Sequence, residues 1–264
     1  MAENPEELRR RGDLLWSDGA RPSRGPKRGL SAEEVVAAAI GIADRDGLGA
    51  LTMQAVAKEV GFTTMALYRY FPSKEALVDA IVDAAWGAPP ERKAPKGDWR
   101  GEVEKWAWAK RAVMISRPWL GELPFIVAPH GPNWLAWLEW AVEALALSGL
   151  GAGDVFDMLH AVDGYVRGGS DTAISFAKAK ARGVSAEEWM ASVAVDLVRT
   201  IDNPRYPTLS ALIQSGLDRD ITLEDNFEFG LQRVLDGCQM YVKHARAKGG
   251  KSKSSSRATR KTRG

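Results

Sequence analysis

Apolar residues recur at intervals of three and four along most of this chain, and no strand-length run alternates apolar with polar residues. Intervals of three and four place side chains on one face of a helix, whereas a strand needs an interval of two. The pattern therefore predicts an all-α fold. It separates four short helices within residues 31–87 from longer helices beyond residue 97.

Capping residues mark the ends of the short helices. Ser31 is followed three residues later by Glu34, the spacing of a capping box in which each side chain satisfies a backbone N–H of the other residue. Thr52 and Ser73 are the expected N-caps of the second and fourth short helices. Gly61 ends the second one.

A proline-rich stretch at 88–97 predicts a connection between two domains. We expect a small N-terminal domain over 30–90 and a larger helical domain over 97–246. The flanking residues, 1–29 and 247–264, are basic and rich in Gly, Ser or Pro, so we expect a flexible arm and a disordered tail. Five glycines are expected to break or kink the longer helices, namely Gly149, Gly151, Gly168, Gly169 and Gly183.

Composition narrows the class of protein. Hydrophobic residues make up 45% and charged residues 27%, which is typical of soluble globular proteins. The single cysteine, Cys238, excludes an internal disulfide and a multi-cysteine metal site, and it suits a reducing compartment. The first residues carry charges where a signal peptide needs an apolar core, and no apolar run is long enough to cross a bilayer. We therefore expect a cytoplasmic protein without a membrane partner.

The segment TTMALYRYF, residues 63–71, predicts a short helix directly after a glycine-containing turn, which is the arrangement of a helix-turn-helix. At about 100° per residue, Leu67 and Phe71 share one side of this helix with Thr63. The other side offers hydroxyl groups, a guanidinium and an apolar contact for thymine methyl groups, from Thr64, Met65, Tyr68 and Arg69. Thr63, at the start of the helix, is also a candidate DNA contact. The same two-helix pattern also occurs in helical proteins that bind no DNA.

The order of the short sequences LT, VAKEVG, LYRYF and SKEAL closely resembles the N-terminal module of the tetracycline-repressor (TetR) family. The match runs without a gap over residues 31–86. The resemblance implies a DNA-binding domain that contacts a palindromic operator. It implies contacts from Thr52, Met53, Gln54, Thr64, Met65, Tyr68, Tyr70 and Lys74, of which Tyr68 and Lys74 match the usual phosphate-contacting residue types and Tyr70 is equally placed to pack.

The chain carries a formal net charge of only +2, but its basic residues are unevenly distributed. One basic tract immediately precedes the first short helix, where other helix-turn-helix proteins have an arm that reaches along DNA. Arg24, Lys27 and Arg28 are the candidates for phosphate contacts in this tract. Solubility is the alternative explanation for both this tract and the basic tail.

Beyond residue 97 the sequence has no catalytic motif. Its histidines lie in separate segments without metal-ligand spacing, so we expect neither an enzyme nor a cofactor or metal site. Tryptophan is abundant, with ten in the chain, and either an aromatic core or an apolar small-molecule cavity would use it. The candidates to line such a cavity are Trp106, Trp134, Trp137, His160, Asp163, Tyr165 and Arg167.

Three sequences, RPWLGELP, GPNWLAWLEWAVEALALSGL and FEFGLQRVLDGCQMYV, resemble the C-terminal domain of tetracycline-repressor-type proteins. The resemblance implies an inducer-binding domain and a homodimer formed through a four-helix bundle. We assign the bundle helices to 153–168 and 224–243. An apolar stripe on the second helix serves the core and the partner, through Phe227, Leu231, Val234, Leu235, Cys238 and Val242.

These observations leave three function classes. The first is a DNA-binding transcriptional repressor that a small-molecule inducer releases from its operator. The second is a TetR-like activator or a ligand-independent DNA binder, and the third is an enzyme or carrier built on a helical bundle. The sequence names neither the inducer nor the operator sequence nor the target genes.

Overall fold

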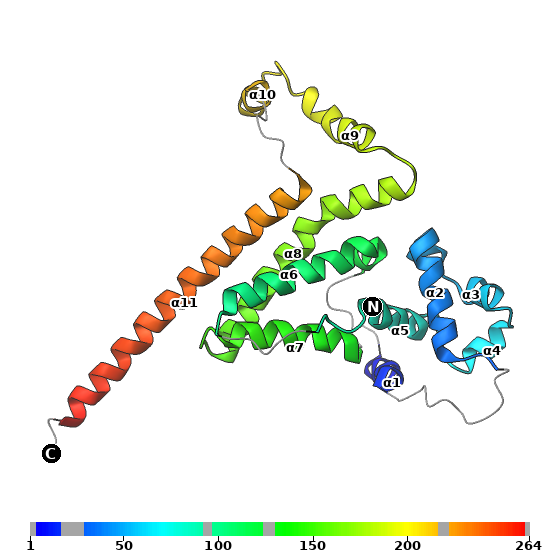
Figure 1. The fold of residues 1–264 in the computed structure, drawn as a ribbon, viewed down its shortest axis with the longest axis horizontal. Helices are drawn as coiled ribbons and strands as arrows, with labels where there is room; N and C mark the ends of the chain where they lie inside the picture. The colour runs from blue at the N-terminus through cyan, green and yellow to red at the C-terminus, as the bar shows by residue number, and fades with distance from the viewer. Residues whose placement is uncertain (1–3, 17–28, 92–96, 124–129, 216–221, 262–264) are drawn as a thin grey trace. The chain divides into compact units, whose positions relative to one another are not determined.

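The computed structural model describes residues 4–16, 29–91, 97–123, 130–215 and 222–261, apart from the side chains of residues 193 and 248–261. Over these residues it contains helices and no strand, as the hydrophobic pattern predicts (Figure 1). The chain divides into two compact units, residues 1–159 and 160–264, which are described separately below.

Over its described residues, the first unit contains seven α-helices, two 3₁₀ helices and the start of an eighth α-helix. Their bounds are α1 (Pro5–Trp16), α2 (Ala32–Asp46), η1 (Leu48–Ala50), α3 (Met53–Val60), α4 (Thr64–Tyr68), α5 (Lys74–Trp86), α6 (Trp99–Ser116), η2 (Pro118–Glu122) and α7 (Pro132–Ala146). The eighth, α8 (Ala152–Ala181), continues into the second unit, which also holds α9 (Ala186–Val198), α10 (Pro207–Gln214) and α11 (Leu223–Lys261).

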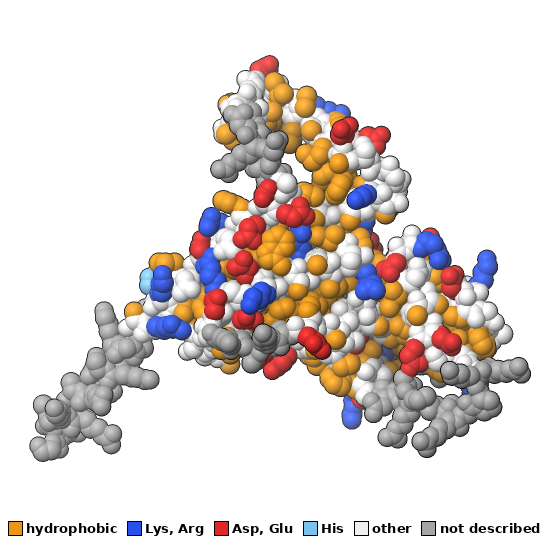
Figure 2. Space-filling view, viewed as in Figure 1, with side chains coloured by type: hydrophobic (Ala, Val, Ile, Leu, Met, Phe, Trp, Pro, Cys, Tyr) orange, Lys and Arg blue, Asp and Glu red, His pale blue; other side chains and the backbone are white. Residues whose placement is uncertain are grey.

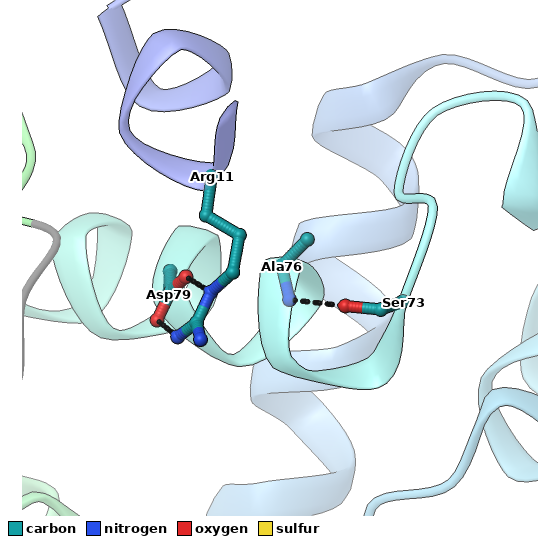
Figure 3. A network of polar contacts seen from close by, with 4 residues as sticks. All are labelled: Arg11, Ser73, Ala76 and Asp79. Atoms are coloured by element: carbon teal, nitrogen blue, oxygen red, sulfur yellow. Dashed lines mark hydrogen bonds and ion pairs between the residues drawn. The ribbon is translucent and has the colours of Figure 1, made fainter. Parts of the chain in front are cut away.

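The predicted caps of the short helices are confirmed. The hydroxyl of Ser31 accepts from the N–H of Glu34 at 3.1 Å, and the carboxylate of Glu34 accepts from the N–H of Ser31 at 2.8 Å. The hydroxyl of Thr52 accepts from the N–H of Ala55 at the start of α3, and the hydroxyl of Ser73 accepts from that of Ala76 at the start of α5 (Figure 3). These bonds satisfy N–H groups that a helix start leaves without partners.

Helices α2, α3, α4 and α5 surround one apolar core. The apolar residues of each helix recur at intervals of three and four, so each helix turns one apolar face toward this core. The buried side chains include Val35, Ala39, Ile42, Leu51, Val56, Leu67, Leu77 and Ile81.

Helices α6 and α7 pack on the end of α5, so they belong to the same compact unit as the four short helices. The indole N–H of Trp137 donates to the carbonyl of Gly87 at 3.0 Å, and that of Trp106 donates to the carbonyl of Trp137 at 3.0 Å. Trp86 and Trp137, on either side of the proline-rich stretch, thus pack together, and the domain division expected at 90–97 stays a prediction.

We expected a flexible arm over 1–29, and this expectation is wrong for Pro5–Trp16 because these residues form the helix α1. Arg11, which belongs to that expected arm, is buried because it pairs with Asp79 on α5. Such a partner lies 68 residues away and leaves no local signal in the sequence. Helix α10 is a second element that the hydrophobic pattern did not predict.

Two expectations for the second unit also need correction. Helix α8 runs through Gly168 and Gly169 without a break, and α11 continues to Lys261 where we had expected a disordered tail from residue 247. Glycine lowers helix stability without forbidding the conformation. Extending an existing helix costs less than nucleating one, so a helix anchored by its buried first part can continue into a polar segment.

Candidate functional site

The turn between α3 and α4 sets the direction of α4. Gly61 adopts the left-handed conformation at φ 75°, and its N–H donates to the carbonyl of Ala57. The N–H of Phe62 donates to the same carbonyl at 2.9 Å, which closes the end of α3. Thr63 then caps α4 by accepting from Ala66 at 3.3 Å. The two helices therefore form the predicted helix-turn-helix.

The two sides of α4 have opposite environments. Leu67 is fully buried and Phe71, just beyond the helix, is 7% exposed, so both anchor α4 to the module as predicted. Met65 is 72% exposed and Tyr68 is 43% exposed. Large apolar side chains on a surface indicate a binding face when they gather beside polar groups. The exposed side of α4 offers such a face, together with the exposed Arg69.

The other predicted DNA contacts divide into exposed and buried residues. Four are exposed and one is half-buried, and they lie at the starts of α3, α4 and α5: Thr52, Gln54, Thr63, Lys74 and the half-buried Thr64. Met53 is only 7% exposed and packs in the core, and its expected groove contact stays a prediction. Met53 lies three and four residues before the buried Val56 and Ala57, and this spacing places it on the core face.

Tyr70 is half-buried, and its hydroxyl donates to the backbone carbonyl of Leu30, just before α2. This bond gives Tyr70 a packing role, which was one of the two alternatives for it. Arg24, Lys27 and Arg28 lie outside the described residues. Their contribution to DNA binding therefore stays a prediction.

Charges near the start of α5 are mixed. Lys74 is exposed at the first position of the helix, and Glu75 follows it. A hydrogen bond from its own backbone N–H holds the pKa of Glu75 below its usual value, with a further contribution from Ser73. The Glu75 carboxylate therefore stays ionised at neutral pH, and its negative charge is attracted by the positive end of the α5 helix dipole.

Helix α5 connects this exposed face to α7 through Asp83. The Asp83 carboxylate is buried, and it accepts from the N–H of Trp134 at 2.9 Å and the N–H of Asn133 at 3.3 Å. The side-chain amide of Asn133 donates to the same carboxylate at 3.1 Å. Asp83 therefore caps the first turn of α7 from a different helix.

A second set of contacts joins α2 and α5 to the segment after α6. The indole N–H of Trp119 in η2 donates to Asp44 near the end of α2 at 2.6 Å. Arg117 donates to the carbonyl of Ala85 on α5 at 2.8 Å. Helices α2 and α5 are thus joined to η2 and α7 through contacts at Asp44, Ala85 and Asp83.

The predicted ligand-pocket residues are divided between the two units. Trp106 and Trp137 are buried and use their indole N–H groups in the packing described above, whereas the half-buried Trp134 stacks on His130 with ring centroids 3.6 Å apart. These three therefore serve the packing of α5, α6 and α7.

The other four pocket candidates lie on α8 in the second unit. Asp163 is buried, Tyr165 and Arg167 are half-buried, and His160 is exposed. The hydroxyl of Tyr165 donates to the carbonyl of Phe227 at 2.8 Å and joins α8 to α11. A pocket that unites all seven residues stays a prediction.

A cavity of about 760 Å³ lies within the first unit, and no feature of the sequence had indicated it. Its walls are apolar residues of α1 and α2, including Leu14, Val36 and Ile40, and Tyr70 and Asp83 also border it. Its volume is in the range of small-molecule sites. None of the seven predicted pocket residues lines it.

The predicted stripe on α11 faces the interior of the second unit. Five of its six residues are buried, Phe227, Leu231, Leu235, Cys238 and Val242, and Val234 is half-buried. Other large side chains of α11 are exposed instead, namely Phe229, Met240 and Tyr241. Figure 2 also shows hydrophobic side chains over α9 and α10, where Met190, Val198 and Leu212 are each more than half exposed.

Among the described residues, no helix is long and apolar enough to cross a membrane. The same residues contain no group of three His, Cys, Asp or Glu side chains arranged to hold a metal ion.

Two family models match the chain. One describes the bacterial regulatory proteins of the tetR family and matches residues 35–81, and the other describes the tetracyclin repressor-like C-terminal domain and matches residues 90–242. A curated relative, the HTH-type transcriptional repressor DrrR1 of Streptomyces coeruleorubidus, is 36% identical over 238 residues, which are 89% of this chain and 86% of the relative.

Solved structures share the fold. The TetR family protein ActR of Streptomyces coelicolor, in complex with actinorhodin, has a TM-score of 0.67 at 20% identity and covers 81% of this chain and 99% of its own. A possible TetR family regulator from the same species has a TM-score of 0.61 at 25% identity and covers 79% of this chain and 98% of its own. With the helix-turn-helix and the C-terminal helices both matched, this chain belongs to the TetR family of DNA-binding transcriptional regulators.

Proposed function

We propose that this regulator is a homodimeric, cytoplasmic repressor that binds a palindromic operator and leaves it when a small molecule binds. The proposal rests chiefly on α4, where Met65 and Tyr68 face outward while Leu67 is fully buried. A helix held firmly from one side with amphipathic groups on the other suits insertion into a DNA major groove. The relative DrrR1 is named a transcriptional repressor, which supports repression over activation.

We assign the DNA contacts to the exposed residues around α4. Met65 is placed for thymine methyl groups, and Thr64 and Arg69 for phosphates or base edges. Tyr68 and Lys74 are assigned to phosphates on either side of the groove. Thr52, Gln54 and Thr63 complete the set at its edge.

A second copy of the chain is needed to read a palindrome, because each copy supplies one α4. The two recognition helices must lie about 34–36 Å apart to enter successive major grooves. We assign the dimer contact to α8 and α11, where Phe156, Phe229 and Met240 are large side chains exposed in the single chain. Apolar surface of this kind favours burial against a partner.

Release by a ligand follows from a shift between two conformations. A ligand that binds more tightly to a form with a different spacing of the α4 helices shifts the protein toward that form and so weakens DNA binding. Operator DNA must weaken ligand binding by the same factor. The contacts of Asp83 and Asp44 are the routes by which movement of α6 and α7 reaches the DNA-binding helices. The solved complex of ActR with actinorhodin supports a ligand-binding role for this fold.

Selection of bound DNA from a random pool tests the DNA-binding proposal. We expect an enriched inverted repeat and a footprint with two-fold symmetry, at half-sites about one helical turn apart. A pool with no enriched sequence would overturn it. Screening compounds for loss of the footprint separates a ligand-responsive regulator from a ligand-independent one, and promoter fusions separate a repressor from an activator.

Tyr68→Phe is expected to weaken operator binding by about threefold to tenfold, as the loss of one hydrogen bond to a phosphate requires. The side chain is exposed and keeps its ring, so the midpoint of urea unfolding should not change. Tyr206→Phe, another exposed tyrosine in the second unit, is the matched control. Equal affinity of the Tyr68→Phe variant and the wild type would remove Tyr68 from the contacts.

The arm is tested through its charges. Changing Arg24, Lys27 and Arg28 together to glutamine should reduce the slope of log K against log salt concentration by about 0.9 for each phosphate that the arm no longer neutralises. The change should weaken binding to operator and to unrelated DNA alike, because phosphate contacts carry no sequence information. An unchanged slope would show that the arm does not touch DNA.

A further inference from the structure

Helix α1 lies outside both regions that the family models match, which begin at residues 35 and 90. It nevertheless packs on α5, the helix that follows the recognition helix. Two polar contacts hold it there, one to α5 and one to the residue before the N-cap of α7. Because α1 touches both α5 and the start of α7, it can control the position of these two helices relative to each other.

The first contact is a buried ion pair. Arg11 reaches from α1 to Asp79 on α5 with Nε–Oδ2 at 2.6 Å and Nη2–Oδ1 at 2.7 Å, a two-pronged arrangement visible in Figure 3. The exposed fractions of the two side chains are 7% and 8%. A guanidinium bound through two parallel bonds fixes orientation as well as distance.

The second contact lies five residues further along α1. The indole N–H of Trp16 donates to the carbonyl of His130 at 3.2 Å. His130 directly precedes Gly131, the N-cap of α7, and its ring stacks on Trp134 in the first turn of that helix. Trp16 thus attaches the end of α1 to the start of α7.

Between these two contacts lies the bond from α5 to α7. Asp83 follows Asp79 by four residues, so both carboxylates lie on one face of α5. Asp79 binds α1, and Asp83 accepts from the backbone of Asn133 and Trp134. Gly131 packs tightly against Asp83, since a Cβ atom there would overlap the Asp83 carboxyl group. We call this set of contacts between Asp83 and residues 131–134 the α5–α7 joint.

We propose that α1 is a brace that holds the α5–α7 joint in the arrangement that binds operator DNA. The inference rests on the proposed function, because the joint lies between the DNA-binding helices and those assigned to ligand release. Arg11 and Trp16 are positioning residues that act through α5 and α7 and touch no DNA. Releasing the brace lets α7 separate from Asp83, and the position of α5, the helix that follows α4 in the chain, is then less firmly fixed.

The test uses the full chain with the paired change Arg11→Gln and Asp79→Asn, which leaves no uncompensated buried charge. The matched control is Arg199→Gln with Asp196→Asn, an exposed ion pair at the end of α9. Operator affinity should fall about tenfold in the brace variant, within the range of about 5- to 150-fold typical of coupling between sites. It should be unchanged in the control.

Hydrogen exchange separates a brace from a merely stabilising contact. The amides of Asn133 and Trp134 donate to Asp83, so they should exchange faster in the brace variant while amides in the core of α2 and α3 keep their protection. Saturating operator DNA should restore the protection, as linkage requires. Unchanged exchange at the joint, or equal acceleration in every peptide of residues 1–159, would overturn the proposal.

Trp16→Phe is a second, milder variant that applies if the paired change does not fold. Trp16 is 57% exposed, so the fold should tolerate the change, which removes only the bond to His130 and part of the ring. We expect exchange at Asn133 and Trp134 to rise and operator affinity to fall about threefold, the effect of one neutral hydrogen bond. No change in either quantity counts against the brace. Failure of the wild type to select any DNA would instead contradict the proposed function.

Discussion

Leu67→Ala is expected to destabilise the DNA-binding helices by about 2–5 kcal/mol, the usual cost of truncating a fully buried leucine. Leu67 is the only residue within α4 that is fully buried, and the helix spans five residues, so it has little else to hold it. The cavity left behind would lie between α4 and the core of α2, α3 and α5. Operator binding should be lost together with the fold of this region.

Met65→Ala, two residues earlier, is the matched comparison. Its side chain is 72% exposed, so stability should change by less than about 0.5 kcal/mol. Operator affinity should still fall, because the variant no longer offers DNA an apolar side chain of this length. Urea unfolding followed by circular dichroism, together with binding to the selected operator, measures both effects. Equal destabilisation by the two variants would mean that the faces of α4 are assigned incorrectly.

Gly131→Ala is expected to cost about 2–4 kcal/mol through overpacking and the poorer N-cap. The backbone at Gly131 has φ −87° and ψ 176°, which any residue adopts, so no conformational strain contributes. The new Cβ would lie within 2.7 Å of three atoms of the Asp83 carboxyl group. Asp83 can move only by giving up its bonds to the start of α7.

Gly151→Ala provides the control for this substitution. The carbonyl of Gly151 accepts the first bond of α8, from Val155, so the residue holds the same position as Gly131 does in α7. No atom lies within 4 Å of a Cβ placed there. It should cost about 0.5–1 kcal/mol, the difference between glycine and alanine as N-caps. Thermal unfolding of the two variants compares the costs, and similar losses would show that the joint is not tightly packed.

The helix-turn-helix could be predicted in detail because its signals are local. The Ser31 capping box, the Thr52 and Ser73 caps and the Gly61 turn are each decided by residues within four positions of one another. The burial of Leu67 and the exposure of Met65 follow from helical spacing alone. Met53 was assigned by resemblance, although its spacing to Val56 already favoured the core.

The pocket candidates show where residue type stops being informative. Trp106 and Trp137 have the character of cavity residues, but their indole N–H groups bond to backbone carbonyls of neighbouring segments. A buried tryptophan needs such a partner whether it lines a cavity or a core. The partner's identity depends on how α5, α6 and α7 pack, which spacing within one helix does not specify.

By itself, the sequence determined the helical class, the caps, the two faces of α4 and the family, because each depends on short-range periodicity or on a contiguous motif. Only the tertiary structure decided that α1 exists and that Arg11 is buried against Asp79. Only the tertiary structure also showed that the carboxylate of Asp83, on α5, caps the start of α7. These contacts join residues about fifty to seventy positions apart, and the free energy that orders them arises from burial and ion pairing that the chain acquires only on folding.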